Sequence, residues 1–274
     1  MKNILVPTDF SSGSVHALNY AGFIAQKTKS NITLLWVDNT SALDFTDDDV
    51  LGRVKQEANE SLEAQIQEFK KLYADVEIKS KIRTGKVYKE VASYTQSYEI
   101  DLVVLGTHGG SGFEDYWIGS NAFRTVSTVP CPVIAIRPDF DFTNRPQMRI
   151  LAPVDHTLDT LAKFETIVPM AKVFDAEVQV LTLYATPLKT INRKADQSTT
   201  MAFKMLEKEG ITCFQDSIVT SNITADIIRF ITNSEIDLMV IMTEQNSTEL
   251  STMPAQEAQQ LINQSPIPVL AVKS

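Results

Sequence analysis

The 274-residue sequence contains little cysteine and no long hydrophobic run. Its two cysteines, Cys131 and Cys213, belong to no CxxC pair, so a disulfide framework is not expected and free thiols are. No stretch approaches the roughly 18 apolar residues of a membrane-spanning helix. The apolar run at the N-terminus ends at Pro7, too early for a signal peptide. We therefore expect a cytoplasmic chain that does not associate with membranes.

Positive charge is also scarce. The chain has 25 Lys and Arg against 34 Asp and Glu, a net charge of −9 at pH 7, which argues against broad electrostatic binding of nucleic acid or an anionic membrane. Backbone N–H groups can still bind a phosphate without basic side chains. The three histidines, His16, His108 and His156, form no HxxxH or His/Cys cluster, and no structural metal site is expected.

The main positive feature of the sequence is an internal repeat. ILVPTDFS at Ile4 resembles ILAPVDHT at Ile150, an offset of 150 − 4 = 146. EIDLVVLGT at Glu99 resembles EIDLMVIMT at Glu235, an offset of 235 − 99 = 136. The second copy thus lacks 146 − 136 = 10 residues, and we expect the loss in the counterpart of the acidic stretch 47–72. Two domains of one fold are predicted, residues 1–143 and 147–274, joined near the proline-containing PDFDFTNRPQM.

Each copy alternates strand and helix patterns. Five apolar runs of the first copy read as strands: KNILV, NITLLWV, VEIKSKI, DLVVLG and VIAIR. Helical patterns lie between them, near 12–28, 48–72, 86–97 and 119–128. This order predicts an α/β fold, with two doubly wound, Rossmann-like domains that each have a five-stranded parallel sheet. Such sheets bind ligands beyond the carboxyl ends of their strands, where the strand order reverses.

Glycine gathers in one place. Five of the chain's ten glycines lie between Gly106 and Arg124, directly after the apolar run LVVL. Gly106 ends that run, and a glycine can adopt backbone angles closed to other residues. Gly109 and Gly110 leave their N–H groups unshielded by side chains, which suits close approach of a phosphate.

A helix start follows this loop. Gly119 and Ser120 precede a stretch of helical spacing, so Ser120 is a candidate N-cap and the helix start a second anion site. The full spacing is Gly-x2-Gly-x9-Gly-Ser. It suggests a cradle for a di- or triphosphate, with a glycine-rich surface loop without a ligand as the alternative. The chain has no P-loop motif GxxxxGK[ST].

This glycine spacing resembles the ATP-binding pattern of the universal stress proteins. ILVPTDFS, LLWVD and VPCPVIAIR also resemble that family at the expected places, and the likeness spans the whole chain. It implies the tandem type with two such domains, of the adenine nucleotide alpha-hydrolase-like fold. It further implies an adenine nucleotide ligand, ATP or else ADP or AMP, with Mg²⁺ as a conceivable companion.

The resemblance implies a role for each matching residue. Pro7, Thr8 and Asp9 would line the nucleoside end of the site, with Asp9 near the adenine or the ribose. Val37 would pack against the adenine. The residues themselves also allow plainer roles: Asp9 could cap the following helix, and Val37 could be ordinary core.

The glycine pattern would take the rest of the nucleotide. By the same resemblance, Gly106 and Gly109 would approach ribose and phosphate. Gly119, Ser120 and Asn121 would bind phosphates through backbone N–H groups, with the Ser120 hydroxyl adding to them.

The second copy lacks this pattern. Met242, Gln245, Ala255 and Gln256 stand opposite the pattern's three glycines and its serine, and Glu257 would repel a phosphate. We therefore predict one nucleotide site per chain. Because the strands on either side persist without these glycines, the comparison assigns the glycines of the first copy to a ligand rather than to the fold.

Three functions remain open at this stage. The first is an ATP-binding regulatory protein of the stress response. The second is a slow ATPase or another ATP-using enzyme, although no catalytic lysine, arginine finger or carboxylate pair stands beside the glycines. The third is an interaction module with a vestigial crevice. The resemblance also suggests that VIAIR and VLAVK pair within one chain as a pseudo-dimer. Association of two chains as a homodimer is a further alternative.

Overall fold

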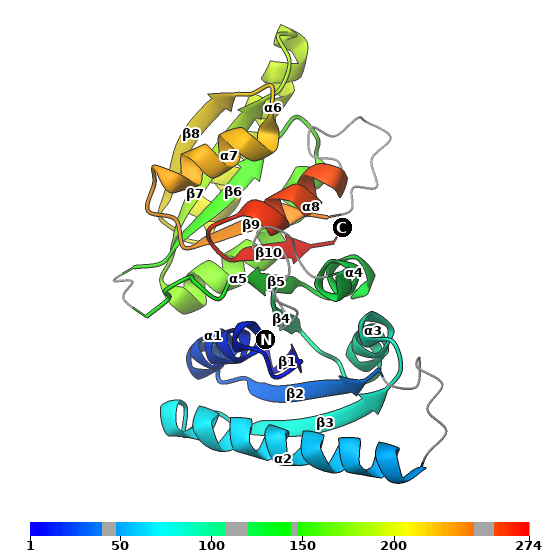
Figure 1. The fold of residues 1–274 in the computed structure, drawn as a ribbon. Coiled ribbons are helices and arrows are strands. Elements are labelled where there is room, and N and C mark those ends of the chain that lie inside the picture. Colours follow the sequence, from blue (N-terminus) through cyan, green and yellow to red (C-terminus); the bar gives the residue numbers. More distant parts are fainter. Residues whose placement is uncertain (40–47, 108–119, 144–146, 244–254, 274) are drawn as a thin grey trace. The chain divides into compact units, whose positions relative to one another are not determined.

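The computed structural model describes residues 1–39, 48–107, 120–143, 147–243 and 255–273. It divides into two compact units, Met1–Asp139 and Phe140–Ser274, each of which alternates strands and helices (Figure 1). None of the described helices is both long enough and apolar enough to cross a lipid bilayer. Both cysteines are free thiols.

Unit 1 follows the strand and helix pattern of its sequence closely. Its elements in chain order are β1 (Asn3–Thr8), α1 (Ser12–Thr28), β2 (Asn31–Asp38), α2 (Asp48–Leu72), β3 (Ile78–Thr84), α3 (Val87–Ser97), β4 (Leu102–Gly106), α4 (Ser120–Thr128) and β5 (Val133–Ile136). The two helices expected at 86 and 119 each begin one residue later. The other two expected helices have the predicted bounds.

The five strands of unit 1 form a parallel sheet in the order β3-β2-β1-β4-β5. The chain runs outward from β1 to β3 and then returns past β1 to β4, so the strand order reverses between β1 and β4. Right-handed crossovers place α1 and α2 on one face and α3 and α4 on the other. The contacts of α1 with α2, and of α3 with α4, agree with this. The predicted fold class is therefore confirmed for this unit.

Unit 2 repeats the same topology. Its elements are β6 (Arg149–Val154), a short 3-10 helix η2 (Asp159–Leu161), α5 (Phe164–Phe174), β7 (Glu177–Tyr184), α6 (Lys189–Lys208), β8 (Cys213–Val219), α7 (Ile223–Thr232), β9 (Leu238–Met242), α8 (Ala255–Gln264) and β10 (Val269–Val272). Its sheet has the order β8-β7-β6-β9-β10, and the strands are again parallel. The tandem arrangement of two such folds is thereby confirmed.

The two units differ in length where the sequence predicted a loss. The offset between copies is 177 − 31 = 146 at the start of the second strand and 213 − 78 = 135 at the start of the third. The helix between these strands has 25 residues in unit 1 and 20 in unit 2. Shortening therefore falls on α6 and its flanking loops, which leaves the central strands of both units unchanged.

Candidate functional site

The carboxyl ends of β1 and β4 lie side by side at the point where the strand order reverses. Ile4 pairs with Leu102 and Leu5 with Val103, so the two strands run in register towards this end. In a doubly wound sheet such an end is the usual place for a ligand. Pro7, Thr8 and Gly106 all stand here, the first two in β1 and the last at the end of β4.

Asp9 organises the turn that follows β1. Its Oδ1 accepts hydrogen bonds from the Ser11 backbone N–H (3.1 Å) and the Ser11 hydroxyl (2.5 Å). The N-cap of α1 is Ser11, whose side chain accepts from the Ser14 N–H. Asp9 therefore supports the cap without being the cap, which corrects one of the two roles that the sequence allowed. Its side chain is exposed, directly after the carboxyl end of β1.

Thr8 faces the helices of its own unit. Its side chain is buried, and its hydroxyl lies 3.1 Å from the Ser14 hydroxyl and 3.3 Å from Gln65 Oε1 on α2. It also accepts a hydrogen bond from the Phe10 N–H. This hydroxyl thus holds the end of β1, the start of α1 and the middle of α2 together. Val37, the residue before the end of β2, is buried as well.

Phe10 is a residue of this end that the sequence reasoning missed. It has a φ of 65°, in the left-handed region that a bulky residue rarely occupies. Its ring stacks on that of Trp36 in β2, with centroids 6.1 Å apart and an interplanar angle of 28°. Backbone conformations of this kind concentrate at functional sites. The only sequence signal for this arrangement was an aromatic residue between Asp9 and a helix cap, which is too weak to read alone.

Gly106 has a packing role that the sequence did not reveal. A Cβ at this position would lie 2.7 Å from the carbonyl oxygen of Gly13 and 2.8 Å from its carbonyl carbon. Both atoms belong to the backbone of the first turn of α1, so they cannot swing aside as a side chain can. The inference that the fold makes no demand on this glycine was therefore wrong for Gly106, because α1 packs directly on it.

The other predicted site residues lie at the boundary of the described residues or outside them. Gly109, Gly110 and Gly119 fall outside the described residues. α4 begins at Ser120, so this serine is the first helical residue and not the N-cap that the sequence predicted, and Asn121 follows in the first turn. The first N–H groups of an α-helix have no partner within the helix and carry a partial positive charge.

Comparison with known proteins identifies the family. The model of the universal stress protein family matches the chain twice, over residues 1–137 and 147–273. The chain belongs to the universal stress protein family. A universal stress protein of Methanocaldococcus jannaschii is 27% identical over 143 residues, which are 50% of this chain and 82% of that protein.

Solved universal stress proteins share the tandem fold. One from Archaeoglobus fulgidus is 20% identical and aligns with a TM-score of 0.77 over 99% of this chain and 96% of its own. A putative one from Pseudomonas aeruginosa is 17% identical and aligns with a TM-score of 0.65 over 100% of this chain and 93% of its own. At these identities the likeness concerns the fold alone.

The second universal stress domain has the same aspartate turn, but there the aspartate is buried. Asp155 Oδ1 accepts from the Thr157 N–H (2.9 Å) and from the Thr157 hydroxyl (2.6 Å), as Asp9 does from Ser11. Whereas Asp9 is exposed, Asp155 is only 3% exposed. The same local chemistry therefore faces solvent in one domain and the interior in the other.

A lysine is buried near Asp155. Lys163 is 2% exposed, and its ammonium group donates to the carbonyl oxygen of Pro153 and to the Thr160 hydroxyl (3.1 Å). Burial lowers the pKa of this amine from 10.5 to about 8, an effect that the negative charge of Asp155 opposes. At the offset of 146 its counterpart in unit 1 is Ala17. Unit 2 thus carries its own cation at the carboxyl end of β6.

The other half of the second crevice is also altered. Met242, the counterpart of Gly106, is buried at the end of β9. Glu257, in the first turn of α8, accepts a hydrogen bond from the buried Thr224 hydroxyl on α7 (2.5 Å). A carboxylate at a helix start is electrostatically favourable, and it occupies the position that would suit a phosphate.

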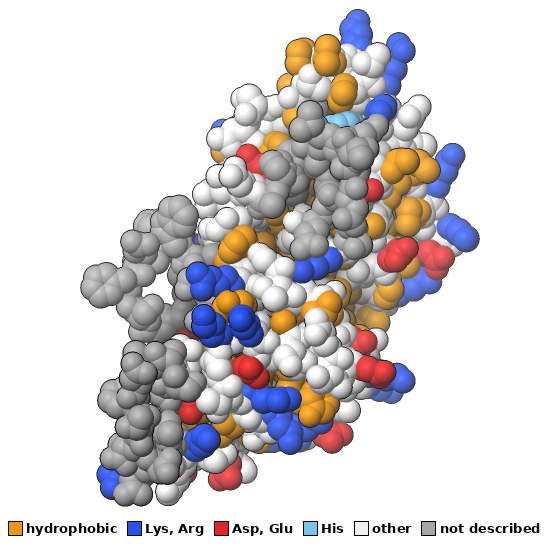
Figure 2. All heavy atoms as spheres, turned by 90° about the vertical axis from the view of Figure 1, so that its right-hand side faces the viewer, with side chains coloured by type: hydrophobic (Ala, Val, Ile, Leu, Met, Phe, Trp, Pro, Cys, Tyr) orange, Lys and Arg blue, Asp and Glu red, His pale blue; other side chains and the backbone are white. Residues whose placement is uncertain are grey.

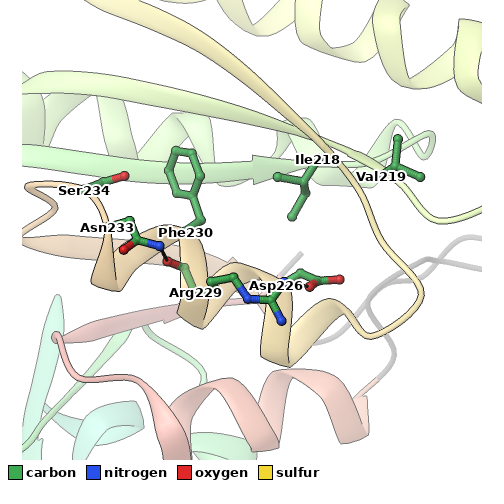
Figure 3. Close-up of a pocket in the computed structure, with 7 residues that line it drawn as sticks. All are labelled: Ile218, Val219, Asp226, Arg229, Phe230, Asn233 and Ser234. Atoms are coloured by element: carbon green, nitrogen blue, oxygen red, sulfur yellow. Dashed lines mark hydrogen bonds and ion pairs between the residues drawn. The ribbon is translucent and has the colours of Figure 1, made fainter.

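Two hollows lined by described residues lie at the outer strands. One, of about 420 Å³, lies between β8 and α7 (Figure 3). The other, of about 580 Å³, lies between β3 and α2. Neither is lined by a residue that the sequence singled out for nucleotide binding. Within the described part of the chain, no three His, Cys, Asp or Glu side chains are grouped to hold a metal ion.

Proposed function

We propose that this universal stress protein binds one adenine nucleotide per chain, at the carboxyl ends of β1 and β4 in its N-terminal domain, residues 1–143. It would act as a cytoplasmic, regulatory protein of the stress response. The observation that carries the proposal is the contrast between two equivalent turns. Asp9 faces solvent at its crevice, whereas Asp155 is buried beside Lys163.

The residues present suit such a ligand. The exposed carboxylate of Asp9 can accept hydrogen bonds from an adenine amine or from ribose hydroxyls. Pro7, Thr8 and Val37 would form the wall on the β1 and β2 side. The start of α4 at Ser120 and Asn121 offers backbone N–H groups to phosphate, and Gly109, Gly110 and Gly119 would let a phosphate approach the backbone. Packing alone accounts for glycine at Gly106, which would mark the floor of the site.

The C-terminal domain, residues 147–274, is proposed to have no nucleotide function. Lys163 and Glu257 already have partners within the domain. A nucleotide entering there would have to displace these buried interactions and leave a charge unpaired, which is costly. We propose that this domain instead completes a pseudo-dimer through β5 and β10, the apolar edge strands of the two units. Small-angle scattering should then fit one rigid particle, and independent tumbling of the units would contradict it.

Binding is favoured over turnover. A phosphoryl-transfer site requires a positioned base and cations around the transferred group. Asp9 is the exposed carboxylate at the described part of the crevice, and it belongs to the β1 side. An ATPase remains the second candidate, and a turnover assay with Asp9→Ala separates the two: hydrolysis that this variant loses would favour the enzyme.

The decisive experiment identifies the ligand directly. Freshly purified protein is denatured, and any released nucleotide is identified by chromatography and mass spectrometry. The stripped protein is then titrated with ATP, ADP, AMP and cAMP by calorimetry; cAMP is included because one universal stress protein has been solved in complex with it. One site per chain is expected, and two equivalent sites, or no binding at millimolar nucleotide, would refute the proposal.

Matched variants locate the site. Gly109→Val and Gly119→Val should each abolish binding because a branched side chain would shield the N–H groups that face the phosphate. Gly52→Val is the control. It lies on α2, and a Cβ added there has no neighbour within 4 Å, so it should leave the nucleotide affinity unchanged.

A further inference from the structure

A basic groove follows the outer edge of the sheet in unit 1. It has a volume of about 580 Å³ and lies between β3 and α2. The residues that line it are Lys55, Asn59, Ser80, Lys81, Ile82, Arg83 and Thr84. Three of them are cations and none is an acid, although the chain as a whole has a net charge of −9. Lys55 comes from α2, whereas the side chains of Lys81 and Arg83 lie on the other face of the sheet. Figure 2 shows Lys and Arg side chains gathered in groups on one face of this acidic protein.

The strand beside the groove has an unpaired edge. β3 is the last strand of its sheet and pairs only with β2 among the described residues. The Glu77 carbonyl accepts from the Ile32 N–H (2.8 Å), and the Gly85 N–H donates to the Asp38 carbonyl (2.9 Å). Odd-numbered residues of β3 therefore direct their backbone groups to β2. By alternation, Ser80, Ile82 and Thr84 direct theirs outward, where another strand can pair with them.

Cations flank this edge on both faces of the sheet. Alternation along β3 puts Lys79, Lys81 and Arg83 on one face, and the Arg83 guanidinium lies 5.6 Å from the Tyr94 ring of α3 on that side. Lys55 reaches the groove from α2 on the opposite face. Within the part of the chain that the structure describes, these lysines form no ion pair. An added strand would therefore meet positive charge on both of its faces.

The fold itself does not require these cations. By the register of the third strands, Phe214, Asp216 and Ile218 of β8 are the counterparts of Lys79, Lys81 and Arg83. A hollow on the other face of this edge, between β8 and α7, the counterpart of α3, is lined by apolar and polar residues, and its one cation, Arg229, is paired with Asp226 at 2.7 Å (Figure 3). The third strand of this fold is thus built in unit 2 without the basic side chains that β3 carries in unit 1.

We propose that the edge of β3 is a docking site for an extended, acidic peptide segment of a partner protein, which adds to the sheet as a further strand. Backbone hydrogen bonds to Ser80, Ile82 and Thr84 would provide the pairing. Lys55, Lys81 and Arg83 would select acidic side chains at alternating positions of the added strand. The site lies on β3 and α2, so it does not depend on nucleotide binding at β1 and β4.

The test measures peptide binding to the full chain by fluorescence anisotropy. The probe is a fluorescently labelled peptide of ten residues. In its sequence, pairs of adjacent Glu residues alternate with Val and Thr. We expect binding that weakens as salt is added, and loss of binding when Glu is replaced by Gln. Methylating alternate backbone nitrogens on one edge of the peptide should abolish binding, whereas the same change on the other edge should not.

Variants of the groove provide the second arm. Lys55→Gln and Lys81→Gln should each weaken binding about 1.5- to 5-fold, the range for exposed ion pairs. Lys204→Gln, which removes an exposed lysine on α6 of unit 2, is the matched control and should have no effect. The proposal is overturned if the peptide does not bind, or if methylation of either edge has the same effect. It is also overturned if the groove variants bind normally but aggregate, since edge lysines would then serve only to prevent strand pairing.

Discussion

Replacing Gly106 by alanine tests whether this glycine serves the fold or a ligand. The added Cβ would lie 2.7 Å from the Gly13 carbonyl oxygen and 2.8 Å from its carbon. Ordinary contacts of a Cβ begin at 3.4 Å, so β4 and α1 must separate by about 3.4 − 2.7 = 0.7 Å. The φ of Gly106 lies outside the left-handed region, so the backbone conformation itself is open to alanine and the cost is steric.

The magnitude follows from two opposing effects. Overpacking of a well-packed interior costs about 1–3 kcal/mol. Alanine also restricts the unfolded chain, which stabilises the folded state by about 0.4–1 kcal/mol where the backbone tolerates it. We therefore expect Gly106→Ala to lower the free energy of unfolding of unit 1 by about 1–2 kcal/mol, in the absence of any nucleotide.

The chain offers a specific assay for this domain. Both tryptophans, Trp36 and Trp117, lie in the N-terminal half, so urea unfolding followed by tryptophan fluorescence reports on unit 1. Gly52→Ala is the control, because it lies in α2 with open space around it and should stabilise the helix by about 1 kcal/mol. If stripped Gly106→Ala unfolds at the wild-type urea concentration, the packing argument fails and a ligand role for this glycine is restored.

Two further predictions concern ionisable side chains of unit 2. The pKa of Lys163 is about 8 in the folded state against the usual 10.5, so the unfolded chain holds this proton longer as pH rises. Stability should therefore rise between pH 8 and 10.5, by up to roughly 3 kcal/mol. Urea unfolding followed by circular dichroism should show this rise in wild type and not in Lys163→Met; equal slopes would argue against the buried ammonium. The hydrogen bond to Asp196 raises the pKa of Tyr184 to about 12. Ultraviolet titration should show a late-titrating tyrosine that Asp196→Asn shifts back towards 10, and an unchanged titration would contradict that bond.

Much of the fold was predictable because its signals are local and repeated. Buried parallel strands read as continuous apolar runs, and the helices between them showed clear periodicity. The internal repeat added a check that one copy alone lacks. The sequence predicted a helix at 48–72 in the first copy and a shorter counterpart in the second. This prediction correctly located the residues that the second copy lacks.

The site was less predictable because its decisive features depend on three-dimensional neighbours. The left-handed φ of Phe10 and its stacking on Trp36 have no sequence pattern. The burial of Lys163 was not predicted from the sequence, because a lysine near the start of a helix is normally exposed to solvent. The packing of Gly106 on Gly13 joins residues 93 positions apart (106 − 13), which spacing within one loop cannot reveal.

The departures of unit 2 form one coupled change rather than independent losses. In unit 1 the helix begins at Ser12, and its first turn lies against Gly106. In unit 2 the matching helix begins only at Phe164, because the residues opposite that first turn form η2 and the bends around it. A different backbone at this point admits Met242 where unit 1 needs glycine. The same rearrangement brings Lys163 back over the end of β6. Restoring glycine at Met242 alone should therefore leave a cavity and not a nucleotide site, because the lysine still occupies the crevice.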